Sequence, residues 1–261
     1  MVVDTSPTVG ERLIQVLDRL GLPQAHFCLR ATEDLVDLGA KAPTRVASVS
    51  VSGAFGNPAG LRPFLNRTLW IQGDEGASAK AVARNLAALG SANVRWLAGY
   101  PDLVWSDTAA DRTAEVADAV LGFLAQRDQA VPLRPEALLG EGEIAGVTYR
   151  AAGRGTPVVL LPLGFSAQQW DPLLPLLQAS HCTIVLGGKY LIPVSQLEDR
   201  AAGDYSRMAL DCLNMAAPRA DESLVEIGCG TGALLRRIAQ RTGMPCVSGV
   251  DINPFMLREA R

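Results

Sequence analysis

Apolar runs of four to seven residues alternate with longer amphipathic stretches along the chain, and glycine or proline often separates the two. Short apolar runs bounded by such residues are typical of buried strands, whereas apolar positions at helical spacing predict helices. Over the first 126 residues this predicts strands at 25–29, 46–51, 68–72 and 94–98, and helices at 9–20, 32–40, 77–89 and 108–126. The alternation favours an α/β fold, with a parallel sheet flanked by helices.

A stretch rich in proline, glycine and glutamate interrupts this pattern at residues 129–142 and is interpreted as a linker. The block after it, residues 143–190, predicts a hairpin at 146–155, strands at 157–161 and 183–186, and a helix around 170–177. A long helix at 196–216 then begins a different pattern. The expected organisation is therefore 1–128, a linker at 129–142, a second block at 143–190 and a third at 191–261.

The third block contains a glycine-dense turn, Glu226-Ile227-Gly228-Cys229-Gly230-Thr231-Gly232, between an apolar strand and an amphipathic helix. Strand, glycine turn and helix in this order bring backbone N–H groups close to a nucleotide-like ligand. The glycines read G-x-G-x-G, and Ala233 stands where the dinucleotide motif has its third glycine, so the fit to NAD is imperfect. The Glu226 carboxylate would repel a pyrophosphate but suits a cationic ligand.

A second apolar strand at 247–250 ends in Asp251, 21 residues after Gly230 (251 − 230 = 21), where an acid can accept hydrogen bonds from ribose hydroxyls. With this acid, residues from about 197 to 261 resemble the start of the class I S-adenosylmethionine-dependent methyltransferases. The resemblance implies S-adenosyl-L-methionine as cofactor, with the glycines passing under its methionine part, Glu226 close to it and Asp251 on the ribose. The implied cofactor-binding residues are Glu226, Gly228, Cys229, Gly230, Thr231, Gly232, Asp251 and Ile252.

The segment from about 9 to 190 resembles an α/β-hydrolase whose C-terminal half (1–128) precedes its N-terminal half (143–190). Hydrophobic pattern and phrases such as Leu20-Gly21-Leu22-Pro23-Gln24-Ala25-His26 carry this likeness. The halves either combine as one permuted sheet or belong to two truncated copies. We favour the permuted sheet, because either half alone would expose a long strand edge and an uncovered apolar face.

The catalytic positions of that hydrolase pattern are not retained. Cys28-Leu29-Arg30-Ala31-Thr32-Glu33 replaces the G-x-S-x-G elbow, and Tyr100-Pro101-Asp102 stands where the histidine is expected. The expected acid is shifted within Gly73-Asp74-Glu75-Gly76, and the chain's two histidines, His26 and His181, are associated with other strands. Without a base to activate a hydroxyl, we expect no hydrolysis.

Composition narrows the alternatives. The chain has 48% hydrophobic and 20% charged residues and a net charge of −3, without a basic stripe, so no nucleic-acid partner is indicated. Five cysteines without a C-x-x-C pair indicate neither a disulfide framework nor a metal site. Since neither a secretion signal nor a membrane-spanning run is recognised, we expect a cytoplasmic protein without a membrane partner.

Three functions remain open. The first is part of a methyltransferase acting on a small-molecule or carrier-bound acceptor, with the hydrolase-like domain as a scaffold or acceptor-recruiting module. The second is a non-catalytic binding or assembly pseudoenzyme, and the third is a working hydrolase. Because the chain ends soon after the second strand of the methyltransferase sheet, we expect it to be too short for methyl transfer by itself. The sequence assigns neither catalytic residues nor an oligomeric state.

Overall fold

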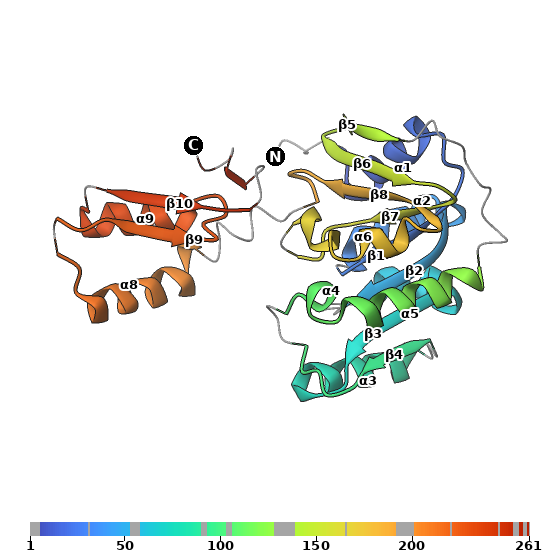
Figure 1. Ribbon diagram of the computed structural model, residues 1–261, viewed down its shortest axis with the longest axis horizontal. Coiled ribbons are helices and arrows are strands. Elements are labelled where there is room, and N and C mark those ends of the chain that lie inside the picture. The colour runs from blue at the N-terminus through green and yellow to red at the C-terminus, as the bar shows by residue number, and fades with distance from the viewer. Residues whose placement is uncertain are drawn as a thin grey trace, which may run out of the picture. The chain divides into compact units, whose positions relative to one another are not determined.

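The computed structural model describes residues 6–30, 32–52, 58–89, 93–102, 106–127, 139–164, 166–191, 201–219, 221–244, 246–252, 256–257 and 260. The chain divides into two compact units, residues 1–192 and 193–261, which are described separately. Figure 1 labels their helices and strands.

Unit 1 is built around an eight-stranded sheet in the order β4-β3-β2-β1-β7-β8-β6-β5. β6 is antiparallel to both of its neighbours, and the other pairs are parallel. Its strands are β1 (Ala25–Leu29), β2 (Val46–Ser52), β3 (Thr68–Gly73), β4 (Val94–Leu97), β5 (Gly140–Ile144), β6 (Val147–Gly153), β7 (Thr156–Leu160) and β8 (His181–Gly187). β5 thus begins within the stretch interpreted as a linker.

The two blocks on either side of that stretch meet in the middle of the sheet. β1 pairs in parallel with β7, and His26, Phe27 and Cys28 lie opposite residues 158–160. Every residue of both strands is buried, as expected for central strands covered on both faces. The prediction that the two blocks combine in one sheet is therefore confirmed, and the alternative that places them in separate sheets is wrong.

Helices cover both faces of the sheet (Figure 1). One face packs against α1 (Val9–Arg19), α2 (Val36–Lys41), η3 (Pro58–Arg67) and α3 (Gly76–Leu89). The other face packs against α4 (Thr108–Asp111), α5 (Thr113–Ala125), η6 (Ala167–Trp170) and α6 (Leu174–Leu177). The single helix predicted at 108–126 is interrupted at Arg112, whose φ of −132° and ψ of 39° leave the helical region. The short helices η1 (Thr32–Leu35) and η2 (Pro43–Arg45) flank α2.

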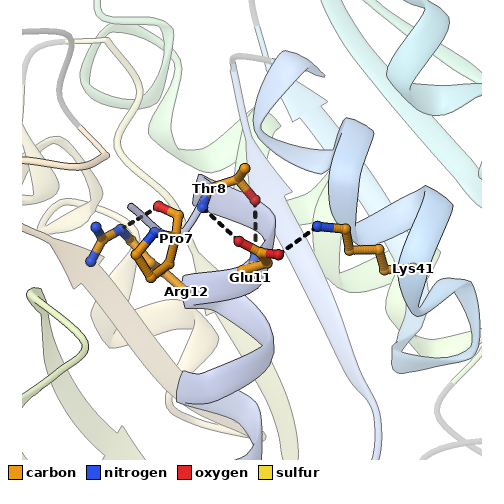
Figure 2. Close-up of polar contacts among 5 residues, drawn as sticks. All are labelled: Pro7, Thr8, Glu11, Arg12 and Lys41. Atoms are coloured by element: carbon orange, nitrogen blue, oxygen red, sulfur yellow. Dashed lines mark hydrogen bonds and ion pairs between the residues drawn. The ribbon is translucent and has the colours of Figure 1, made fainter. Parts of the chain in front are cut away.

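A capping box starts helix α1, as the sequence predicts (Figure 2). Glu11 N–H donates to Thr8 Oγ1 at 3.3 Å, and Thr8 N–H donates to Glu11 Oε2 at 2.9 Å. Lys41 of α2 donates to the other oxygen of Glu11 at 2.6 Å, and this hydrogen bond is the main cause that lowers the pKa of Glu11. The Glu11 side chain thus accepts the backbone hydrogen bond of the N-cap residue Thr8 and also links α1 to α2.

Arg12 connects the same turn to the β5–β6 hairpin. Its Nε donates to Pro7 O at 3.0 Å (Figure 2), and its Nη1 donates to Ala145 O at 2.5 Å. The guanidinium carbon lies 3.3 Å from the centre of the Tyr190 ring. This buried arginine therefore joins the start of unit 1 to segments more than 130 residues away.

Unit 2 follows the predicted order of helix, strand, glycine turn, helix and strand. It contains α8 (Asp204–Ala216), β9 (Leu224–Ile227), α9 (Ala233–Thr242) and β10 (Val247–Val250), and β10 pairs in parallel with β9. The expected start of the first helix at residue 196 lies outside the described residues. None of the helices described in either unit has the length and apolar character needed to span a membrane.

Candidate functional site

The turn between β9 and α9 has a backbone that depends on its glycines. Gly228, Gly230 and Gly232 have φ values of 77°, 54° and 69°, in the left-handed region that side chains with a Cβ disfavour. Gly232 is also the N-cap of α9, and its N–H donates to Cys229 O at 2.8 Å. The three glycines therefore stand at the positions of this turn where the backbone is in the left-handed conformation.

The tip of β10 holds this turn from the other side. Gly230 N–H donates to Asp251 Oδ2 at 2.7 Å, which joins two residues separated by 21 positions. The N–H groups of Gly228 and Cys229 both donate to Val250 O, at 2.7 and 3.1 Å. The structure thus brings the glycine-rich loop and the acid after the second strand together, as the sequence spacing predicts.

Two acidic side chains set the electrostatics of the loop. Glu226 is partly buried, and its Oε2 has no hydrogen-bond partner among the described residues. Burial raises the pKa of Glu226, and the nearby negative charge of Asp251 raises it further. Burial also raises the pKa of the Cys229 thiol, again with contributions from Asp251 and Glu226. The loop therefore favours a cationic group more than a phosphate.

The remaining predicted site residues are Thr231, within the glycine-rich loop, and Ile252, after β10. Thr231 is buried, and its carbonyl accepts from Arg236 Nη1 of α9 at 2.7 Å. Ile252 follows Asp251 with 77% of its side chain exposed. The structure therefore gathers residues 226, 228–232 and 251 around one turn, whereas Ile252 lies exposed beside it.

One face of the two-stranded sheet is apolar and uncovered. Val225, Ile227 and Val250 are 59%, 88% and 57% exposed, and Ile227 lies opposite Val250 in the register. On the other face, Gly249 lies against Cys229 and against Leu235 of α9. Parallel strands are ordinarily covered on both faces, whereas the described residues of unit 2 leave this face of the two strands exposed.

At the carboxyl ends of the unit 1 strands, Asp102 occupies the place where a hydrolase histidine was expected. It is fully buried, its φ is 37°, and its Oδ1 accepts from Thr108 Oγ1 at 3.2 Å. Burial raises the pKa of Asp102, and the positive charge of Arg30 opposes that effect. A Cβ on Gly73 would lie 2.1 Å from Tyr100 O, so the absence of a side chain at Gly73 lets the backbone of residues 100–102 pass close to β3.

Sequence reasoning missed Arg30. Its Nη1 donates to Leu163 O at 3.2 Å and to Ser106 O at 3.4 Å, which links the loop that follows β1 to the loops that follow β7 and β4. The available signal was a cation directly after a short strand that is apolar except for His26. Nothing in the sequence pointed to its partners, one of which is 133 residues away.

Both histidines lie at the amino ends of their strands, opposite the ends that hold Arg30 and Asp102. His26 is the second residue of β1 and shares a 2.7 Å hydrogen bond with Ser48 Oγ. His181 is the first residue of β8 and shares a 2.8 Å hydrogen bond with Ser180 Oγ. Strands β1, β7 and β8 run parallel, so their carboxyl ends lie on the same side of the sheet as Arg30, which directly follows β1. Neither imidazole lies at these carboxyl ends. In the part of the chain that the structure describes, no three His, Cys, Asp or Glu side chains gather in a way that could hold a metal ion.

Comparison with known proteins finds no family model that matches the chain. Aklanonic acid methyltransferase DauC of Streptomyces sp. (strain C5) is 33% identical over 81 residues, which cover 28% of this chain and 37% of that protein. The demethylmenaquinone methyltransferases of Tropheryma whipplei strains Twist and TW08/27 are 33% identical over 93 residues, 31% of this chain and 38% of theirs. The chain thus spans less than two fifths of the length of these relatives, and a part of it is similar to methyltransferases.

Proposed function

We propose that residues 191–261 are the first part of an S-adenosyl-L-methionine-binding methyltransferase domain. The 2.7 Å hydrogen bond between Gly230 N–H and Asp251 carries this proposal, because it brings a glycine-rich loop and an acidic side chain to the same ends of two parallel strands. The partial similarity to methyltransferases supports the same assignment. We attribute that similarity to this region.

The residues present suit this cofactor. Asp251 would accept hydrogen bonds from the ribose hydroxyls, and the Glu226 carboxylate would favour the positive charge of the cofactor. A Cβ built on Gly228 meets no atom within 4 Å, so this position leaves room for a bound molecule. The cofactor, when bound, supplies a methyl group activated on a sulfonium. The acceptor remains a small molecule or a carrier-bound group in this proposal.

In this proposal, unit 1 is a non-catalytic α/β-hydrolase-like domain with permuted halves. The sheet order supports it, since β6 is antiparallel to its neighbours and lies second from the β5 edge, and the strands from the two sides of the linker stretch meet in the middle of the sheet, where β1 pairs with β7. Asp102 and Arg30 occupy the strand ends where catalytic groups would be needed, without a histidine beside them. Such a domain would act as a scaffold or recruit the acceptor, in the cytoplasm.

The second candidate is a binding or assembly protein in which neither site works. The uncovered face of Val225, Ile227 and Val250 favours it, because exposed apolar side chains on a parallel sheet can dock a partner. A working hydrolase is disfavoured, since both histidines lie at the amino ends of their strands, away from Arg30 and Asp102.

Calorimetric titration with S-adenosylhomocysteine tests the proposal. We expect weak or no binding by the 261-residue chain. Micromolar binding is expected once the chain is lengthened past Arg261 with the matching carboxyl-terminal part of the Tropheryma whipplei relative, which would cover the exposed face. Binding by neither protein, with both folded, would favour the assembly role, and tight binding by the short chain would show that the site is built differently.

A further inference from the structure

The glycine-rich loop rests on a contact that its motif does not include. Gly249 of β10 lies directly under Cys229, the residue between the first two glycines of the loop. A Cβ built on Gly249 would lie 2.6 Å from Cys229 Sγ and 2.8 Å from Cys229 Cβ. It would also lie 3.3 Å from Leu235 Cδ2 of α9, so the space between strand, loop and helix is already filled.

The contact acts on the residue that fixes the loop. The Cys229 side chain is 7% exposed, and its N–H donates to Val250 O at 3.1 Å. Cys229 stands between Gly228 and Gly230, whose backbone N–H groups donate to Val250 O and to Asp251 Oδ2. A side chain at Gly249 that displaced Cys229 would therefore be expected to disturb these two hydrogen bonds.

We propose that Gly249 and Cys229 form a size-matched pair that positions the glycine-rich loop for its cofactor, with Gly249 as a positioning residue. This inference rests on the proposed function for the identity of the ligand. The packing itself is a property of the free chain. It can therefore be measured without any cofactor.

The first measurement uses the 261-residue chain and two readouts. In the wild type we expect Cys229 to react slowly with iodoacetamide, because the thiol is buried and its pKa is raised. Gly249→Ala is expected to increase Cys229 alkylation at least tenfold, mapped by mass spectrometry, and to increase amide exchange at Gly228 and Gly230 by a similar factor. Gly122→Ala in α5 is the matched control, since a Cβ there meets nothing within 4 Å, and it should change neither readout.

A double substitution separates this pair from a general loss of stability. In a Cys229→Gly background the two nearest atoms, Cys229 Sγ and Cβ, are gone and only Leu235 Cδ2 at 3.3 Å remains, so adding Gly249→Ala should change loop amide exchange less than threefold. If Gly249→Ala alone does not fold while the double variant does, the pair is supported. An equal increase of exchange in both backgrounds, no increase in either, or unfolding of both would overturn it.

The cofactor arm uses the lengthened chain and S-adenosylhomocysteine. Gly249→Ala is expected to weaken binding at least tenfold, and Gly122→Ala should leave it unchanged. A displaced loop with unchanged affinity would overturn the positioning role. If the wild type itself does not bind, the proposed function fails, while alkylation and exchange still decide whether the packing pair exists.

Discussion

Replacement of Asp251 tests the link between the glycine-rich loop and the tip of β10. Asp251→Ala removes the acceptor of the 2.7 Å hydrogen bond from Gly230 N–H, and with it the proposed acceptor for the ribose. Hydrogen bonds to a charged group contribute about 1.5 to 3 kcal/mol. The loss corresponds to roughly a tenfold to a hundredfold decrease in affinity for S-adenosylhomocysteine.

The assay is calorimetric titration of the lengthened chain, with two comparison variants. Asp251→Asn keeps an oxygen acceptor without the charge and should bind between the wild type and Asp251→Ala. Asp211→Ala removes an exposed acid from α8 of the same unit and should bind like the wild type, which controls for the change of net charge. Full affinity in Asp251→Ala would refute the reasoning. An equal loss in Asp211→Ala would show that overall charge, not the hydrogen bond, is responsible.

Three further predictions concern unit 1. Thr8→Ala removes the capping acceptor for Glu11 N–H and should cost about 1 kcal/mol, seen by calorimetry as a fall of about 2–4 °C in the melting temperature of unit 1; no fall would contradict the cap. Burial raises the native pKa of Asp102 above its usual value, so the folded state binds the proton more tightly and stability falls as pH rises above about 4. Asp102→Asn should therefore stabilise the protein in urea unfolding at pH 7, with a gain that vanishes below about pH 4; a gain that grows at low pH would reverse the assignment. The chain should not hydrolyse an activated aryl ester above the protein-free background, and turnover abolished by changing Thr32 or Ser166 would contradict this.

The sequence alone determined the local elements of both units. The apolar runs at 25–29 and 157–161 are too short for helices and too apolar for a sheet surface, so they indicated central strands, which the structure confirms. The glycine spacing at 228–232 indicated a turn between a strand and a helix, and the structure places this turn there with all three glycines at positive φ. These predictions succeeded because they depend on neighbours in the chain.

Only the tertiary structure decided which distant residues meet. The pairing of β1 with β7 follows from burying both faces of each strand, and several strand orders are compatible with the same local pattern. The partners of Arg30 and the fit of Cys229 onto Gly249 depend on register and on the shapes of packed side chains. Sequence spacing contains no such information, because contacts across a sheet are set by the whole of the packed core and not by the residues beside them in the chain.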